Sequence, residues 1–344
     1  ELAQLLEYGL EPQTLALPLY GTNSRRAVGG ARMEYHFDRT RSQLFRNVHL
    51  GASFQTFSLA SNDQYVDTYE RWVPSVRIDL RRDLSKPVQH GFRIRSVILS
   101  ERAQFRDDDN NGGVFRSDLE IFRELRYDMV RTAGFNPFSL NATVLDHEAF
   151  TRVSVEAKWA AIYDKHKHRV SFRLFAGEFL RTDKRLMSSA YGWRFHPGNF
   201  DLLFDHLIFN RQGIGQLTDQ QITKDLGGFK TPTSYGTSDT WIAALNMELD
   251  APFTLPISFF ASTGAAPSKT VTNTGTTNSV KFQYEGGIGL RILRDVAEIW
   301  VPLVFSPDIT DELEFRNFEF AERIRFVLAL EKLDPSRALR KAPF

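Results

Sequence analysis

Apolar and polar residues alternate almost without error between residues 280 and 291. Apart from the glycines, even positions are apolar and odd positions are polar, the apolar set being Val280, Phe282, Tyr284, Ile288 and Leu290 and the polar set Lys281, Gln283, Glu285 and Arg291. Successive side chains of a β-strand point to opposite faces, so this pattern predicts a strand between an apolar medium and water. A length of roughly ten residues is enough for a tilted strand to cross a bilayer.

The same alternation recurs along the chain and predicts about 14 strands, within a range of about 12 to 16. The expected strands are residues 31–37, 47–58, 72–81, 92–98, 118–130, 138–144, 153–161, 170–176, 200–210, 241–249, 255–261, 280–291, 297–305 and 324–330. Helical periodicity is nearly absent, and many strands separated by turns favour an antiparallel sheet.

The connections between these strands differ in length. Working back from the C-terminus, short connections at 250–252 and 292–296 alternate with long polar ones at 211–238, 265–279 and 306–317. Outer-membrane barrels have this asymmetry, with short periplasmic turns and longer outer loops. The long connection 211–238, which contains Phe229 and Tyr235, is also a candidate to fold inward as a plug.

Strand length separates a membrane barrel from a soluble β-sandwich. Sandwich strands usually have about 5 to 6 residues, whereas the stretches 152–164, 168–179 and 280–291 are about twice as long. Closure of the sheet would also satisfy every backbone polar group in lipid. We therefore predict an all-β fold, a transmembrane antiparallel barrel over residues 28–333. Residues 1–27 are expected to be a lead-in from a preceding periplasmic domain and residues 334–344 a tail.

Composition excludes several other classes. No apolar run approaches the roughly 18 residues of a membrane helix, so none is predicted. The 43 basic and 42 acidic residues are intermixed, which gives no basic stripe for nucleic acid. The chain has no cysteine, so disulfides, thiolate metal sites and cysteine nucleophiles are absent from it. Its 29 phenylalanines suit strands and the aromatic girdles of membrane barrels.

The alternation assigns side chains to two faces of the predicted barrel. The lumen-facing charged candidates are Arg77, Asp79, Arg93, Arg95, Lys281, Glu285, Arg291, Arg323, Arg325 and Glu331. The lipid-facing candidates are Val155, Trp159, Phe172, Leu174, Val280, Phe282, Ile288, Leu290, Ile299, Val301, Ile324, Phe326 and Leu328. Charges of both signs at similar depth favour an interior of ion pairs that closes the lumen, rather than an ion-selective ring of one sign. On this assignment Ile288→Arg should impair membrane assembly, whereas Gln283→Arg should be mild.

Several short stretches resemble the C-terminal region of large Bacteroidota envelope proteins, in which an aminopeptidase-N-like gluzincin metallopeptidase domain comes first. They are Asn136-Pro137-Phe138-Ser139-Leu140, Arg173-Leu174-Phe175-Ala176-Gly177, residues 204–211, Gly227-Gly228-Phe229-Lys230, residues 241–246 and residues 323–335. The resemblance spans residues 31–335. It implies a barrel that anchors or completes a larger envelope protein in the outer membrane of a Gram-negative bacterium.

The enzymatic residues of that family cannot be carried over to this chain. Gluzincin zinc binding needs His-Glu-x-x-His on a helix, and the only His-Glu pair is His147-Glu148, with Thr151 where the second histidine belongs. We expect this pair in a polar, water-exposed turn. No catalytic residue, metal site or cofactor is therefore predicted.

Three other motifs have ordinary structural interpretations. His166 and His168 lie in a cationic hairpin that is more typical of a solvated loop tip than of a metal site. The acidic run 107–112 lacks the ligand spacing of a calcium loop. Gly213-Ile214-Gly215 and Gly227-Gly228 lack the strand-to-helix setting of a phosphate-binding loop, so we expect loop glycines.

The function expected from the sequence is that of an outer-membrane barrel without catalysis of its own. It would serve as the membrane anchor or a subunit of a larger envelope protein or assembly. One alternative is an outer-membrane channel or transporter for small solutes, and another is a soluble β-sandwich binding module. The expected partners are outer-membrane lipid and other outer-membrane or periplasmic subunits, and no nucleic acid.

Overall fold

The computed structural model describes most of the 344-residue chain. The described residues are 11–17, 29–37, 44–61, 65–80, 88–105, 114–116, 119–131, 136–166, 168–198, 201–206, 208, 217–252, 255–272 and 275–329. They form a 15-stranded antiparallel sheet in which strands adjacent in sequence pair with one another, and only β6 lies off this path. The predicted all-β class and antiparallel sheet are confirmed, and no described helix is long and apolar enough to cross a membrane.

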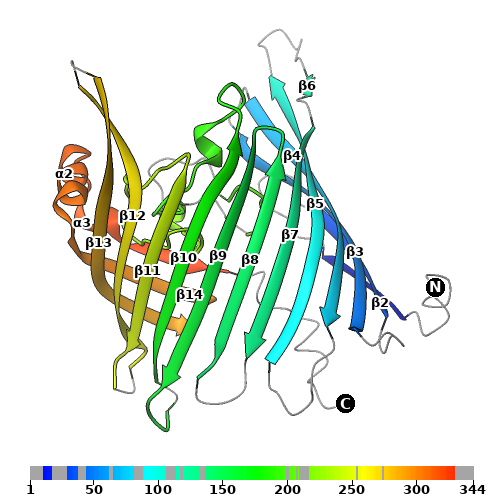
Figure 1. The fold of residues 1–344 in the computed structure, drawn as a ribbon, viewed down its shortest axis with the longest axis horizontal. Helices are drawn as coiled ribbons and strands as arrows, with labels where there is room; N and C mark the ends of the chain where they lie inside the picture. Colours follow the sequence, from blue (N-terminus) through cyan, green and yellow to red (C-terminus); the bar gives the residue numbers. More distant parts are fainter. Residues whose placement is uncertain are drawn as a thin grey trace. The chain divides into compact units, whose positions relative to one another are not determined.

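The chain divides into two compact units, and the division passes through β9 and β10 (Figure 1). Unit 1 comprises residues 1–157 and 179–187, and unit 2 comprises residues 158–178 and 188–344. The strands up to this division are β1 (Glu11–Leu17), β2 (Gly29–Phe37), β3 (Phe45–Ser61), β4 (Tyr65–Leu80), β5 (Val88–Phe105), β6 (Val114–Arg116), β7 (Glu120–Arg131), β8 (Phe138–His147), β9 (Phe150–Ile162) and β10 (Arg169–Thr182).

Unit 2 continues with β11 (Trp241–Asp250), β12 (Ile257–Thr272), β13 (Gly275–Leu293), β14 (Ala297–Phe305) and β15 (Arg325–Leu328). Its 3-10 helices are η1 (Ser189–Tyr191) and η2 (Leu217–Gln220), and its α-helices are α2 (Pro307–Phe315) and α3 (Phe320–Arg323). Each strand from β10 to β15 pairs antiparallel with the next. The long connection between β10 and β11 contains η1 and η2 and no named strand in its described part.

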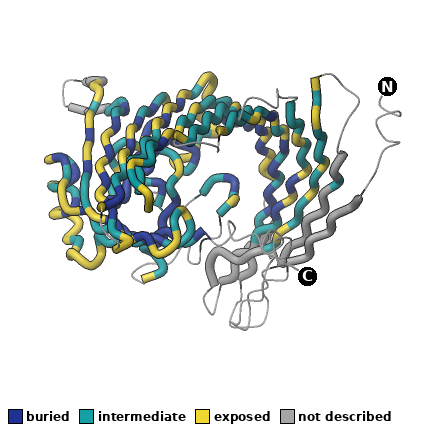
Figure 2. The backbone as a smooth tube through the Cα atoms, turned by 90° about the horizontal axis from the view of Figure 1, so that it is seen from below, coloured by how far each residue is buried: buried dark blue, intermediate teal, exposed yellow. Residues whose placement is uncertain are grey.

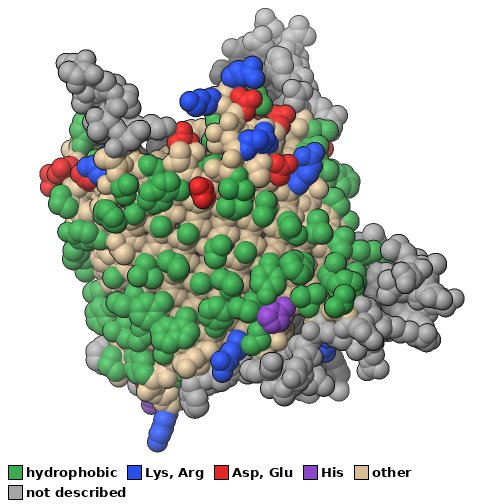
Figure 3. All heavy atoms as spheres, in the orientation of Figure 1, with side chains coloured by type: hydrophobic (Ala, Val, Ile, Leu, Met, Phe, Trp, Pro, Cys, Tyr) green, Lys and Arg blue, Asp and Glu red, His purple; other side chains and the backbone are tan. Residues whose placement is uncertain are grey.

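Burial alternates along the strands of unit 2 (Figure 2), and in β13 the alternation is inverted, with polar residues buried and apolar residues exposed. In β13, Gln283 and Glu285 are 1% and 2% exposed, whereas Phe282 is 72% exposed. Hydrophobic side chains gather on the outer face of β11–β13, and charged ones lie mostly toward its margins (Figure 3). The period-2 pattern therefore places Gln283 and Glu285 on the buried face of β13, and the buried face of the neighbouring strands also carries apolar residues, among them Phe260 and Trp300.

One expected strand is replaced by a turn. In the described part of residues 200–210, the carboxylate of Asp201 accepts hydrogen bonds from the backbone N–H groups of Leu203 (3.1 Å) and His206 (2.7 Å). Phe204 has a φ of 54°, in the left-handed region. An aspartate that satisfies its own following backbone competes with strand pairing, and here it forms the turn.

Two expected loops carry regular structure. Strands β12 and β13 extend to Thr272 and back from Gly275, over most of the stretch 265–279 assigned to a polar loop. The stretch 306–317 contains α2, which begins with Pro307 and buries Ile309 and Leu313 on one face. A proline in the first turn and apolar residues four apart are helix signals that strand periodicity obscured.

The expected division into a lead-in, a barrel and a tail stays a prediction. Strand β1 lies within the stretch 1–27 that the sequence assigned to a lead-in, and it pairs antiparallel with β2. The tail at 334–344 lies outside the described residues, as do the acidic run 107–112 and Gly213-Ile214-Gly215.

The connection between β10 and β11 depends on Gly236. This residue has a φ of 79°, and a Cβ atom there would collide with the ring of Phe195, which stacks on Phe229 at 4.8 Å. We expect Gly236→Ala to destabilise unit 2 by about 1–3 kcal/mol, because backbone strain and steric overlap act together. Denaturant unfolding in detergent measures this, with Gly286→Ala as a control because its Cβ would meet nothing closer than 3.4 Å.

Candidate functional site

Most of residues 221–232, which we call the inner segment, are buried against the inward face of β11–β14, called the polar face here although it also carries Phe260 and Trp300. Within the inner segment, Phe229 and Thr231 are 0% exposed and Lys230 is 2% exposed. The segment belongs to the connection 211–238 that the sequence marked as able to fold inward. Ile222 packs in a hydrophobic cluster with Phe260 and Trp300. The polar attachments of the segment to the strands occur at three places.

The first attachment covers the edge of β15. Gln221 forms a parallel bridge with Phe326, and the backbone N–H of Ile222 donates to the Phe326 carbonyl at 2.8 Å. The Gln221 side-chain amide donates to the Leu328 carbonyl at 3.0 Å. The opposite edge of β15 pairs with β14. The inner segment thus satisfies edge carbonyls that an exposed strand would leave available for pairing.

The second attachment is a carboxylate clasp. Glu285 of β13 accepts hydrogen bonds from the backbone N–H groups of Lys230 and Thr231, both at 2.7 Å. All three residues are buried, so the carboxylate satisfies two donors that would otherwise be desolvated without partners. Strand alternation turns Glu285 inward, and the clasp holds the inner segment at this position.

The third attachment is an ionic network around Trp300 of β14. Lys224 Nζ lies 2.6 Å from Glu298 and 3.4 Å from Glu248, and Lys230 Nζ lies 3.6 Å from Glu248. Both ammonium groups also lie over the Trp300 ring, at 5.1 and 5.0 Å from its centroid. Such positions combine charge pairing with cation–π attraction.

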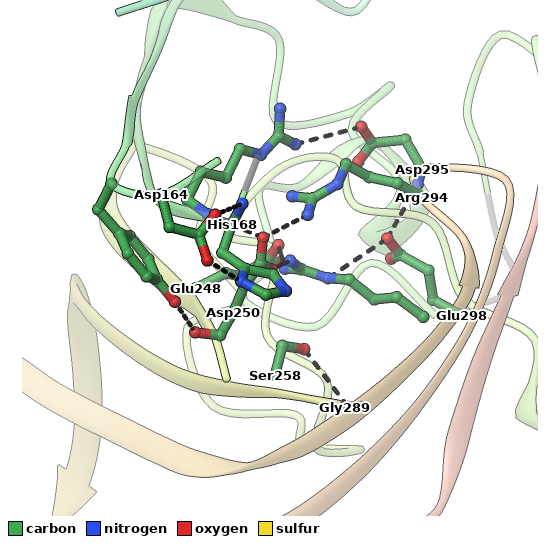
Figure 4. Close-up of polar contacts among 12 residues, drawn as sticks. Asp164, His168, Glu248, Asp250, Ser258, Gly289, Arg294, Asp295 and Glu298 are labelled. Carbon is green, nitrogen blue, oxygen red and sulfur yellow. Dashed lines mark hydrogen bonds and ion pairs between the residues drawn. The ribbon is translucent and has the colours of Figure 1, made fainter. Parts of the chain in front are cut away.

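The network continues toward the short turns at one end of the strands (Figure 4). Arg291 pairs with Glu248 and Asp250 and lies 3.8 Å from Glu298, and Arg294 pairs with Asp250. Asp250 also accepts a hydrogen bond from the backbone N–H of Arg169 at 3.0 Å. The ion pairs therefore join the β9–β10 hairpin, the end of β11 and the turn between β13 and β14.

Signs balance within this network. Its buried or half-buried carboxylates are Glu248, Asp250, Glu285 and Glu298, and its cations are Lys224, Lys230, Arg291 and Arg294. Burial opposes the charge of Lys224, but Glu248 and Glu298 raise its pKa overall, so its ammonium group stays protonated. Burial lowers the pKa of Lys230 in spite of Glu248 and Glu285. Among these eight residues the four carboxylates match the four cations in number.

Two glycines and an asparagine allow the inner segment to lie close to the strands. A Cβ atom on Gly227 would lie 2.5 Å from Phe195 Cα, and Gly228 has a φ of 70°. Asn246 of β11 donates its side-chain amide to the Gly227 carbonyl at 2.9 Å. We expected these glycines to be ordinary loop residues, but close approach and positive φ make them necessary here.

The predicted lumen-facing residues fall into different environments. In unit 2, Glu285, Arg291 and Arg325 are 2%, 7% and 7% exposed. Lys281 is half-exposed and pairs with Asp308 of α2 at 3.1 Å. Arg323 lies on α3, where its guanidinium donates to the Phe318 carbonyl, and not on the strand expected at 324–330. Glu331 lies outside the described residues.

In unit 1, the predicted inward charges form ion pairs, two of them with Glu124, which was not among the predicted residues. Arg95 and Glu124 are 8% and 6% exposed and form a bidentate pair, with Arg93 3.1 Å from the same carboxylate. Arg77 and Asp79 pair at 3.0 Å, but the Arg77 side chain is 59% exposed. Both arginines were predicted to face inward, but only Arg95 is buried.

All of the predicted lipid-facing residues are exposed or half-buried. The exposed ones are Val155, Trp159, Leu174, Val280, Phe282, Ile288 and Leu290. Those of intermediate exposure are Phe172, Ile299, Val301, Ile324, Phe326 and Leu328. None of them is among the buried hydrophobic residues of the described chain.

Sequence reasoning missed the inner segment's own charges and their partners. Glu248 and Glu298 sit at inward positions of alternating strands, so the period-2 pattern contained a signal for both. Lys224 and Lys230 lie in an irregular connection with no periodicity, and only folding brings them to Trp300. Gln283 was also misjudged, because it is 1% exposed and bonded to Ser306 and Asp308.

The histidine motifs have structural surroundings. His147 is not in a water-exposed turn as expected: it is 2% exposed, stacks on Phe122 at 4.5 Å, and accepts the backbone N–H of Ala149. His168 pairs with Asp164 in the β9–β10 hairpin, and the described residues contain no group of three metal-ligating side chains.

His196, in the connection between β10 and β11, provides a pH-dependent prediction. Burial lowers its pKa to about 3, and its ring N–H donates to the Phe229 carbonyl at 3.1 Å. Because the folded-state pKa lies below the unfolded value, its contribution to stability is complete above about pH 6.5 and falls as pH drops toward 3. The loss should reach up to about 1.4 kcal/mol per pH unit in that window. Denaturant unfolding should show a shallower acid dependence in His196→Gln, and equal slopes would contradict this prediction.

Comparisons with known proteins identify no family for the chain. No protein-family model matches it, and no curated protein matches it. Among solved structures it aligns with CdiB from Acinetobacter baumannii at 8% sequence identity and a TM-score of 0.29. The alignment covers 87% of this chain and 63% of CdiB, so the chain spans less than two thirds of that protein.

Proposed function

We propose that the chain is an outer-membrane β-barrel of a Gram-negative bacterium and acts, without catalysis, as the anchor or a subunit of a larger envelope protein. In this role its inner segment keeps the polar face of unit 2 closed. The membrane-embedded side chains are those of the exposed apolar face. Lipid is the partner of that face, and other envelope subunits are the partners of its loops.

The inverted burial of unit 2 is the observation that supports this proposal most strongly. Leu245, Phe259 and Phe282 are 43%, 44% and 72% exposed on three successive strands, and polar side chains of the same strands, Asn246, Ser258 and Glu285, are buried on the other face. A protein folded in water gains free energy by the reverse arrangement, about 25 cal/mol per Å² of apolar surface removed from water. An apolar outer face of this size is favourable when lipid covers it.

The closed state is supported by the balanced ionic network and by the inner segment. An open pore needs a hydrated lumen, whereas Glu285, Glu298 and Lys230 are each at most 2% exposed. Their contacts are direct and short. Filling of the polar face by the chain's own residues fits an anchor better than a solute channel.

Membrane extraction and planar-bilayer recording test the two parts of the proposal separately. We expect the chain to fractionate with outer membranes and to change gel mobility on heating, as folded barrels do. In bilayers we expect insertion without stable conductance steps. Stable open steps would favour the alternative, a channel for small solutes. A refolded chain that stays monomeric and soluble without detergent would exclude both membrane functions.

The family resemblance suggests the identity of the larger protein. We infer from it that a gluzincin-like domain precedes the barrel, either in the same protein or in its assembly. The coding sequence upstream of Glu1 tests this inference directly. A His-Glu-x-x-His helix there would support the anchor function, and a different kind of domain would remove the peptidase association without affecting the membrane assignment.

A further inference from the structure

Two lysine ammonium groups of the inner segment occupy adjacent positions on the wall of unit 2. Lys230 Nζ lies 5.0 Å from the Trp300 ring centroid and 5.1 Å from that of Phe260, and Lys224 Nζ lies 5.1 Å from that of Trp300. Both lysines come from the connection, whereas both aromatic rings belong to strands. The ammonium groups are thus held in an environment that the wall provides.

The wall also provides the matching negative charges. Glu298 is 1% exposed and lies 2.6 Å from Lys224 Nζ. Glu248 lies 3.4 Å from Lys224 Nζ and 3.6 Å from Lys230 Nζ. Each ammonium group therefore has a carboxylate on one side and the face of an aromatic ring on another.

The wall groups are held in place by contacts that do not involve the lysines. Phe260 and Trp300 pack edge to face at 5.2 Å, and Gly289 leaves room for the indole, since a Cβ there would collide with it. Arg291 pairs with Glu248, and the backbone N–H of Asp295 donates to Glu298 at 2.9 Å. Removing the lysines should therefore leave these groups in position.

The ligand class follows from this set of groups. Magnesium and calcium require about six or more oxygen ligands, and two carboxylates supply too few. An alkylammonium group matches a carboxylate and an aromatic face, and its alkyl chain can replace the lysine methylenes. Arg291 already occupies the guanidinium position 5.5 Å from the Trp300 ring.

We propose that Glu248, Glu298, Trp300 and Phe260 form a binding site for primary alkylammonium groups, which Lys224 and Lys230 fill when the inner segment is seated. The segment is then a built-in occupant that an external amine can replace. This inference goes beyond the proposed function and does not depend on it, because membrane insertion involves the opposite face of the strands.

Thiol labelling provides the test, because the chain has no cysteine. Thr231 is 0% exposed and its hydroxyl has no hydrogen-bond partner among the described residues, so Thr231→Cys introduces a buried reporter with little disturbance. In detergent, K224A/K230A leaves buried carboxylates without their partners, so the inner segment should leave the strands more often. Maleimide labelling of this cysteine should therefore be faster by roughly tenfold or more. Millimolar n-butylammonium should restore slow labelling, whereas 1-butanol and sodium chloride should not.

A second arm avoids the double variant in case it fails to fold. With both lysines present, n-butylammonium should accelerate labelling of Thr231→Cys, because it competes with them, and Glu298→Gln should weaken this effect. Thr240→Cys is the control, because Thr240 is exposed, and its labelling rate should be the same with and without n-butylammonium. Equal effects of butylammonium and butanol, or no effect of the amine in either arm, would overturn the proposal. Heat-dependent gel mobility tests the proposed function independently of these results.

Discussion

Ile288→Arg is expected to reduce the folded, membrane-inserted fraction and to cost about 2–4 kcal/mol, the cost of arginine on the lipid face of a barrel near the bilayer midplane. Ile288 is 38% exposed on β13, and its neighbours on the same face are Gly286 and Leu290. If this face instead contacted water, the same substitution would change stability by no more than about 0.5 kcal/mol. Gel mobility on heating and denaturant unfolding in lipid measure the difference.

The matched control is Phe315→Arg. Phe315 is 87% exposed on α2, outside the strands, so arginine there should be nearly neutral. The control suggested by the alternation alone, Gln283→Arg, is unsuitable. The Gln283 side chain is buried and bonded to Ser306 and Asp308, so its replacement would disturb the interior. Equal effects of Ile288→Arg and Phe315→Arg would refute the assignment of the lipid face.

Arg291→Met is expected to destabilise unit 2 by about 3–5 kcal/mol, because removal of one member of a buried ionic network leaves its partners charged and unpaired. Arg291 is 7% exposed and pairs with Glu248 and Asp250. Methionine keeps a similar volume, so the loss reports on charge more than on packing. Denaturant unfolding of the inserted chain measures it.

A surface pair and a double-mutant cycle provide the controls. Arg77 pairs with Asp79 at 3.0 Å, but its side chain is 59% exposed, so Arg77→Met should cost at most about 1 kcal/mol. Glu248→Gln combined with Arg291→Met should cost less than the sum of the two single changes. Strict additivity, or a small effect of Arg291→Met alone, would show that the network contributes little to stability.

Period-2 alternation was sufficient to predict most strands, because inward and outward environments differ so strongly that each position must match its face. It succeeded along β13 and β14, where both faces follow it. It failed where a local interaction or helical packing dominated, at the turn of Asp201 and in α2. The alternation also assigned Arg323 to the inward face of a strand, but this residue lies on the helix α3.

The candidate site could be predicted only in part. Glu285 and Arg291 were identified as inward charges, since their position on a strand determines the face on which they lie. Their partners could not be predicted from the strand pattern. Glu285, for example, accepts hydrogen bonds from backbone N–H groups of the inner segment. His147 shows the same limit, since a polar motif in a turn was buried by an aromatic neighbour.

The sequence by itself determined that this protein is a large antiparallel sheet with one apolar and one charged face, since strand geometry converts alternation directly into two surfaces. Only the tertiary structure decided what covers the charged face. The inner segment lacks periodicity. Its Lys224 meets Glu248 and Glu298, which lie 24 and 74 residues further along the sequence. Contacts of that kind depend on how an irregular connection returns to the sheet, which local residue patterns do not specify.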